Sequence, residues 1–237
     1  MKTTVVLGAM DSEVALLVSQ LEQQRVETHS GVECHCGFVN GNPVVVVRCG
    51  IGKVNAARAT QLAVDCFDPY LIINSGIAGG LASDLSIGDV IVGVKLVEHD
   101  FDLSPIGYVR GCMAYDSDPK TPTYYTAQDA FVSNMLVAAQ NVAKGRKVRP
   151  GTVASGDVFV ADAGLKRQLS EDFKADVAEM EGAAIAHVAD ACGVPFLVLR
   201  VVSDLANGEA PSSFEQFEKE TADLSANIIL EFCGKGK

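Results

Sequence analysis

The sequence predicts an α/β fold: one three-layer domain over residues 1–237, in which helices flank a mixed and largely buried central sheet. Segments with the pattern of strands alternate with segments with the pattern of helices along the whole chain. The strand-like segments are mainly apolar along their length, which is typical of a sheet covered on both faces. The sequence shows no internal repeat, low-complexity tract or linker, so its 237 residues are expected to form a single domain.

The first half of the chain contains the clearest strand signals. Apolar or alternating runs predict strands at residues 5–7, 32–39, 44–49, 70–74 and 90–97. Asn40-Gly41 separates the second and third of these runs and is a strong hairpin signal. Apolar residues at helical spacing predict a helix at residues 14–21, with Asp11 or Ser12 as its N-cap. An Ala-rich helix is predicted at residues 53–67.

The second half continues the alternation after an irregular middle. Residues 99–126 are polar and irregular and contain three of the eight prolines. Helices are predicted at residues 128–143, 180–192 and 214–232. Residues 153–160 are typical of a strand followed by a loop, and residues 196–202 of a buried strand that ends at Ser203-Asp204.

The composition narrows the class of protein. A formal net charge of −11 argues against a nucleic-acid partner, because phosphate backbones require clustered Lys and Arg. No segment reaches the roughly 18–20 apolar residues needed to cross a bilayer. The first residues do not resemble a secretion signal, so we expect a cytoplasmic protein with no membrane partner.

The cysteines fit the same expectation. Three of the seven lie in apolar runs and are interpreted as buried thiols: Cys49, Cys66 and Cys192. Cys34-x-Cys36 could form a metal or redox site, but one face of a strand gives the same spacing, and strand packing is favoured.

Candidate functional residues follow the carboxyl ends of the predicted strands, where open α/β sheets bind their ligands. Glu13 lies just after the first strand, Glu179 and Glu181 open a helix, and Asp204 ends the last strand. A glutamate in the first turn of a helix is usually a partner of the helix dipole, which is the alternative for Glu13 and Glu181. A carboxylate directly after an apolar strand, such as Asp204, would be costly unless it were paired or used.

Two glycine-rich segments lie at the same edge, at residues 50–52 and 76–80. The first lacks the third glycine of the dinucleotide fingerprint and the second lacks the Lys-Ser or Lys-Thr of a P-loop, so simple tight turns are an alternative. His99 and His187 lack the spacing of metal ligands, and His187 is expected to be packed on its Ala-rich helix. No metal and no cofactor is expected.

Together these segments resemble the methylthioadenosine/S-adenosylhomocysteine nucleosidases, a family within the nucleoside phosphorylase superfamily. Six motifs carry the resemblance, occur in the family's order and span almost the whole chain. They are Gly8-Ala9-Met10-x-x-Glu13, Gly50-Ile51-Gly52-Lys53-Val54-Asn55-Ala56-Ala57, Asn74-Ser75-Gly76-Ile77-Ala78-Gly79-Gly80, Ser155-Gly156-Asp157-Val158-Phe159-Val160, Glu179-Met180-Glu181-Gly182-Ala183-Ala184-Ile185-Ala186-His187-Val188 and Arg200-Val201-Val202-Ser203-Asp204. The resemblance implies a nucleoside phosphorylase-like fold.

The resemblance further implies hydrolysis of the N-glycosidic bond of 5′-methylthioadenosine and S-adenosylhomocysteine, with release of adenine. Glu13 would activate the attacking water, and Asp204 would protonate N7 of adenine. Two carboxylates on either side of the scissile bond follow the logic of inverting glycosidases. The loop that begins Asn74-Ser75 has no arginine to grip phosphate, which favours water as the nucleophile.

The resemblance also implies how the substrate is bound. Glu181 and Met180 would clamp the ribose hydroxyls, and Phe159 with the backbone of Val160 would hold adenine. Apolar side chains would surround the 5′-thio substituent, and further residues would line the site. The apolar group is Ile51, Met180 and Phe214, and the further residues are Glu179, Ile77, Ala78 and Ser203.

Residues 99–108 carry several large apolar side chains, which either fold back onto the core or form a subunit interface. The resemblance favours a homodimer in which one or more of four residues complete the partner's pocket: Phe101, Leu103, Ile106 and Tyr108. Two features depart from the family. Ile77 replaces a frequent Ser or Thr, which changes the water network, and residues 110–123 are longer than usual, which can shift specificity.

Three alternatives stay open at this point. A phosphorylase of the same fold would release ribose 1-phosphate instead of the free sugar. A nucleosidase for another adenosine, such as 5′-deoxyadenosine or aminofutalosine, would share the sugar and base contacts. A nucleoside-binding or storage protein would be recognised by the loss of Glu13 or Asp204, and both are present.

Overall fold

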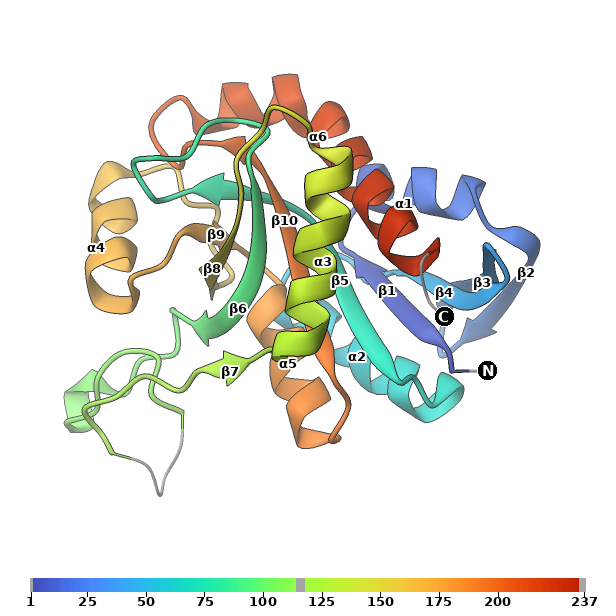
Figure 1. The fold of residues 1–237 in the computed structure, drawn as a ribbon. Helices are drawn as coiled ribbons and strands as arrows, with labels where there is room; N and C mark the ends of the chain where they lie inside the picture. Colours follow the sequence, from blue (N-terminus) through green and yellow to red (C-terminus); the bar gives the residue numbers. More distant parts are fainter. Residues whose placement is uncertain (1, 114–117, 235–237) are drawn as a thin grey trace.

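The computed structural model describes residues 2–113 and 118–234 and shows a central sheet with helices on both of its faces (Figure 1). The predicted α/β class with a mixed sheet is confirmed, since the sheet contains parallel and antiparallel pairs. Of the segment at residues 110–123, whose length departs from the family, residues 114–117 lie outside the described residues. No helix within the described ranges combines the length and apolar character that a membrane span requires.

Ten strands form the sheet in these ranges: β1 (Thr4–Gly8), β2 (Glu22–His29), β3 (Val32–Val39), β4 (Asn42–Arg48), β5 (Leu71–Gly80), β6 (Val90–Glu98), β7 (Tyr125–Thr126), β8 (Val148–Ser155), β9 (Val177–Glu179) and β10 (Phe196–Asp204). Five of them close a ring, because β10 pairs with β5 and β6, β8 pairs with β6 and β9, and β9 pairs with β5. From β5 the sheet continues through β1 and β4 to β3 and β2, while β7 pairs with β6.

Six α-helices and a 3-10 turn accompany the strands of the described ranges: α1 (Asp11–Ser19), α2 (Lys53–Phe67), α3 (Asp129–Val142), α4 (Ala163–Phe173), α5 (Gly182–Ala191), α6 (Ala210–Gly234) and the turn Ser104–Ile106. Helices α1 and α3 pack against α6, whereas α2 packs against α5 on the other side of the sheet (Figure 1). Every residue of β1 and β10 is buried between these layers, so the apolar core lies on both faces of the sheet.

Three parallel strands bring the candidate residues to one edge of the sheet. β5 pairs in parallel with β1 and with β10, so Leu7 and Val198 both lie opposite Asn74. The carboxyl ends of the three strands lead to α1, to the glycine-rich end of β5 and to Asp204, which pairs with Gly79. This register places the ends of the candidate segments side by side.

The predicted hairpin joins β3 and β4. Asn40 and Gly41 have φ values of 49° and 78°, the left-handed values that a two-residue turn of this kind needs. The two strands are antiparallel, and Val39 pairs with Asn42 directly across the turn. The bounds of β3 agree with the predicted residues 32–39.

The cysteine predictions are confirmed in part. Cys34 and Cys36 are buried free thiols on the same face of β3, so the strand interpretation of their spacing is correct. The prediction that Cys66 and Cys192 are buried is wrong, because both lie on solvent-facing positions at the end of α2 or α5. Cys49 is half-buried.

Sequence patterns do not reveal β2 and α4. β2 is exposed along most of its length at the edge of the sheet, so its sequence carries no apolar alternation. α4 buries Leu169 and Phe173 against the core and is otherwise polar, which gives a weak helical pattern.

Two boundaries also differ from the prediction. β5 continues to Gly80 instead of ending near Asn74, so residues 76–80 belong to a strand and are not a tight turn. The N-cap of α1 is Met10 and not Asp11 or Ser12, and the Glu13 carboxylate in the first turn accepts the N–H groups of Met10 and of Ala9 before it.

Candidate active site

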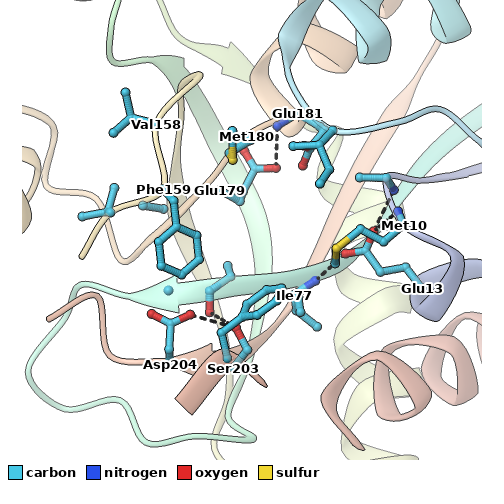
Figure 2. A pocket seen from close by; sticks show the side chains of 17 residues that line it. Met10, Glu13, Ile77, Val158, Phe159, Glu179, Met180, Glu181, Ser203 and Asp204 are labelled. Atoms are coloured by element: carbon cyan, nitrogen blue, oxygen red, sulfur yellow. Dashed lines mark hydrogen bonds between the residues drawn. The ribbon is translucent and has the colours of Figure 1, made fainter. Parts of the chain in front are cut away.

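A pocket opens at the edge of the sheet where β1, β5 and β10 end (Figure 2). All twelve residues that the sequence suggested for catalysis or substrate binding line this pocket: Glu13, Ile51, Ile77, Ala78, Phe159, Val160, Glu179, Met180, Glu181, Ser203, Asp204 and Phe214. Five residues that were not suggested complete the lining: Ala9, Met10, Gly79, Val158 and Ala178. The structure therefore brings residues from six separate motifs into one cavity.

Glu13 is held by backbone groups at the floor of the pocket. Its Oε2 accepts hydrogen bonds from the N–H groups of Ala9 and Met10, at 2.7 and 3.0 Å, and its Oε1 accepts one from Ile77 N–H at 3.1 Å. Burial raises the pKa of Glu13, although Arg200 and these N–H groups oppose the rise. Both carboxylate oxygens of Glu13 are buried and accept backbone N–H groups, including one from β5. The helix dipole alone does not account for this arrangement.

Gly76 in β5 leaves room for two charged side chains beside the strand. A Cβ atom at Gly76 would collide with Glu13 Oε1 and would lie 2.7 Å from Arg200 Nη1. The missing side chain lets a carboxylate and a guanidinium approach the strand backbone from the same side. The glycine is therefore required by close approach and not by a turn.

Arg200 is the main residue of the site that the sequence analysis missed. It is 1% exposed in the middle of β10 and pairs with Glu179, and its Nη2 lies 3.8 Å from Glu181 Oε2. Asn74 Oδ1 accepts a further hydrogen bond from it. An arginine inside an otherwise apolar strand was the available signal, since a buried charge requires partners.

Glu179 is the carboxylate that balances Arg200. Burial alone would raise its pKa, but the Arg200 charge and hydrogen bonds from Ser155 and Gly182 hold the pKa below its ordinary value. Its Oε2 also accepts the N–H of Glu181 at 3.1 Å. Both oxygens are thus taken up by donors of the protein.

The pKa of Glu181 is shifted in the opposite direction to that of Glu179. Its Oε1 accepts the N–H of Gly52 at 2.9 Å. Burial and the charge of Glu179 raise the pKa of Glu181 to about 8, with Arg200 opposing the rise. The pocket therefore favours the carboxylate form of Glu179 and the protonated form of Glu181.

Asp204 ends β10 on the other side of the pocket from Glu13 (Figure 2). Its Oδ1 accepts Ala206 N–H at 2.8 Å and its Oδ2 accepts the hydroxyl of Ser203 at 3.0 Å. Burial raises the pKa of Asp204, and these two donors and Lys166 oppose the rise. A raised pKa favours the protonated form of Asp204, which suits a group that donates a proton.

The remainder of the pocket is apolar. Phe159 and Phe214 meet edge to face, with ring centroids 5.7 Å apart and planes at 89°. Ile51, Phe159 and Met180 also line the pocket, and Ile51 and Phe159 keep 52% and 45% of their surface exposed. Such a slot suits a flat aromatic ring and an apolar chain.

The two singled-out histidines lie outside the pocket lining. His187 stacks on Tyr125, with centroids 4.8 Å apart, and its Nδ1 lies 3.1 Å from Glu98 Oε1. Its side chain is nevertheless 43% exposed, so the expectation of a packed histidine is only partly correct. His99 is buried after β6.

Known proteins similar to this chain share its fold and most of its length. Residues 3–233 match the phosphorylase superfamily. A 5′-methylthioadenosine/S-adenosylhomocysteine nucleosidase of Halalkalibacterium halodurans is 38% identical over 231 residues, which cover 97% of both chains. A protein of the same description from Neisseria meningitidis, solved in complex with methylthio-immucillin-A, is 33% identical, with a TM-score of 0.89 over 98% of both chains. A futalosine hydrolase of Helicobacter pylori is 31% identical, with a TM-score of 0.88 over 98% of this chain and 97% of that one.

Proposed function

Because the chain belongs to the 5′-methylthioadenosine/S-adenosylhomocysteine nucleosidase family of the phosphorylase superfamily, we propose that it hydrolyses both of these adenosines. The products are adenine and the 5′-thio-substituted ribose. The observation that carries this proposal is the placement of Glu13 and Asp204 on opposite sides of one pocket with an apolar slot between them (Figure 2).

Asp204 is the proposed general acid. Breaking the N-glycosidic bond leaves negative charge on the purine, which a proton delivered to N7 neutralises. The buried, protonated form of Asp204 supplies that proton, while Ser203 and Ala206 fix the direction of the carboxyl group. Positioned proton transfer of this kind contributes roughly 10²–10⁴-fold to the rate.

Glu13 is the proposed general base. Three backbone N–H groups hold its two oxygens, so the carboxylate faces the pocket in one orientation. It accepts a proton from water as that water attacks the anomeric carbon from the face opposite the leaving adenine. Ile77 offers its N–H to Glu13 and an apolar side chain to the pocket, so the water is held without a hydroxyl from this position.

The other lining residues bind the two halves of the substrate. Glu181 and Met180 contact the ribose hydroxyls, and Phe159 with Val160 holds adenine. Ile51, Met180 and Phe214 surround the 5′-thio group, and Ala78 and Ser203 line the site between the sugar and the base. Glu179 accepts a hydrogen bond from the backbone N–H of Glu181, and Arg200 lies beside both carboxyl groups. Glu179 thereby helps to fix the position of Glu181.

The charges of the pocket favour water over phosphate as the nucleophile. The Arg200 guanidinium is already paired with Glu179, and no lysine or arginine is among the described residues that line the cavity. A phosphate dianion placed there would lack a free bidentate partner. Hydrolysis is therefore preferred to the phosphorolysis that the same fold could support.

The test is adenine release from methylthioadenosine with and without phosphate. We expect the rate to be the same in both, with methylthioribose as the second product. Phosphate dependence, or a sugar phosphate among the products, would show that the protein is a phosphorylase.

A nucleosidase for another 5′-modified adenosine is the second candidate, because a futalosine hydrolase shares the fold over nearly the whole chain. The base and ribose contacts would be the same, so only the 5′ pocket distinguishes the two. Comparison of kcat/KM for methylthioadenosine, 5′-deoxyadenosine and aminofutalosine decides between them. We expect methylthioadenosine to be preferred, because apolar side chains form the 5′ end of the pocket.

We also propose a cytoplasmic homodimer. Ile106 is 67% exposed, and Phe101, Leu103 and Tyr108 are only half-buried, so these side chains do not fold fully into the core. A second copy of the chain would cover them across a two-fold axis and complete the open mouth of the pocket. The buried free thiols of β3 are compatible with a reducing compartment.

A further inference from the structure

We propose that Lys166 is a positioning residue for Asp204: its ammonium group clamps the turn that carries Asp204 and places a positive charge within electrostatic reach of the carboxyl group. Lys166 belongs to α4, an element that contributes no side chain to the pocket lining. The inference rests on the proposed role of Asp204 as proton donor.

The clamp consists of two hydrogen bonds to backbone carbonyls. Lys166 Nζ donates to the oxygen of Leu205 at 2.6 Å and to the oxygen of Gly80 at 3.0 Å. Leu205 directly follows Asp204, and Gly80 ends β5, whose Gly79 pairs with Asp204. One ammonium group thus joins the two backbone segments on either side of the carboxyl group.

The clamped turn has a strained backbone and little free space. Ala206 is fully buried with φ of 48°, a left-handed value that non-glycine residues rarely adopt. A Cβ at Gly79 would lie 2.9 Å from Asp204 Oδ1 and 3.2 Å from Ala206 Cβ. Conformations of this kind persist where the surroundings fix them, and Lys166 together with the Ala206–Asp204 hydrogen bond does so here.

The positive charge of Lys166 also lowers the pKa of Asp204 and so opposes the rise that burial causes. The other partners of Asp204 are neutral, a hydroxyl and a backbone N–H. The pocket glutamates Glu13, Glu179 and Glu181 lie across the cavity from Asp204 (Figure 2). The Arg200 charge acts on all three of them. The interaction is reciprocal, because Asp204 opposes the lowering of the Lys166 pKa by burial.

This charge has a direct consequence for the reaction. When Asp204 gives its proton to N7, it becomes a buried carboxylate, which burial disfavours. The ammonium group of Lys166 stabilises that carboxylate and so strengthens Asp204 as an acid. Loss of the charge should raise the pKa of Asp204 and slow proton delivery, whereas loss of an unrelated surface charge should do neither.

The experiment follows the ¹³C signal of the Asp204 carboxyl group by NMR, assigned through its absence in Asp204→Asn. Lys166→Gln keeps a hydrogen-bond donor without the charge, and Lys166→Arg keeps the charge. Arg167→Gln removes an exposed charge from the next position of α4 and is the matched control. We expect Lys166→Gln to raise the Asp204 pKa by about one unit, with no comparable change in Lys166→Arg or Arg167→Gln.

Activity gives a second reading of the same effect. Asp204 must be protonated to act, so a higher pKa should move the alkaline limb of kcat/KM to higher pH in Lys166→Gln. We also expect kcat to fall about tenfold with little change in KM. If wild-type protein cleaves no adenosine, the proposed function fails, whereas the NMR titration still decides the role of Lys166.

The reciprocal titration covers the case in which Lys166→Gln does not fold. Burial lowers the pKa of Lys166, and the Asp204 carboxylate opposes this lowering. In Asp204→Asn the carboxylate is absent, so the pKa of Lys166 should fall. An unchanged Lys166 pKa there would overturn the proposal. Equal effects of Lys166→Gln and Arg167→Gln on Asp204 would overturn it as well.

Discussion

Replacing Glu181 by Gln should remove a pH dependence of folding stability that the wild-type protein carries. Burial and the charge of Glu179 raise the pKa of Glu181 from 4.5 to about 8 in the folded protein. Between these two values the folded protein binds a proton that the unfolded chain has already lost. The free energy of unfolding therefore falls as the pH rises through this window, and the loss from Glu181 is complete above about pH 8.

The size of the effect follows from the shift. At about 1.36 kcal/mol per pKa unit, the full shift of Glu181 corresponds to roughly 5 kcal/mol. Because Glu179 and Glu181 titrate as a pair around Arg200, we expect roughly 2–5 kcal/mol in the measured difference. Gln keeps the size of the side chain, and its carbonyl oxygen can accept the Gly52 N–H bond that Glu181 Oε1 now accepts at 2.9 Å.

The assay is urea unfolding of both proteins near pH 5 and near pH 8.5. Glu181→Gln should be similar to wild type at the lower pH and more stable than wild type at the higher pH. Glu171→Gln, on the exposed side of α4, is the matched control and should show no such divergence. A difference between Glu181→Gln and wild type that is the same at both pH values would refute the raised pKa of Glu181.

Other expected outcomes concern turnover, assembly and the core. Asp204→Asn cannot deliver an acidic proton, so turnover should fall by at least ~100-fold with folding intact; near-normal turnover would remove Asp204 from the mechanism. Ile106→Asp should weaken the dimer and raise KM for 5′-thio substrates together, and a fully active monomer in sedimentation at micromolar concentration would contradict this. Arg200→Met leaves Glu179 buried without its counter-charge and should cost roughly 3–5 kcal/mol; an unchanged urea midpoint would show that the pair does not stabilise the fold.

The position of the pocket could be predicted because its residues follow recognisable strand ends. Glu13 lies in the first turn of α1, the helix that follows β1, and Asp204 ends β10. Parallel pairing of both strands with β5 places the two residues at the same edge. The glycine motif at residues 76–80 was correctly placed there, although it is strand and not turn. Its glycines serve close approach, which a sequence signals only as a missing side chain.

Arg200 and Lys166 could not be assigned in this way, because their partners lie far away in the sequence. Arg200 contacts Asn74 from β5 and Glu179 from β9, and Lys166 contacts the carbonyls of Gly80 and Leu205. A single charge in an apolar strand shows that partners must exist but not which ones. β2 and α4 escaped prediction because exposed elements need few apolar residues, so their sequences carry a weak period.

The most direct test of the central claim uses ¹⁸O-labelled water with ordinary phosphate present. If Glu13 activates water, one ¹⁸O atom should enter the anomeric position of methylthioribose for each adenine released from methylthioadenosine, as read by mass spectrometry. Glu13→Gln should lose adenine release and label together. A sugar phosphate that carries no solvent oxygen at this position would contradict the claim that the pocket uses water as its nucleophile.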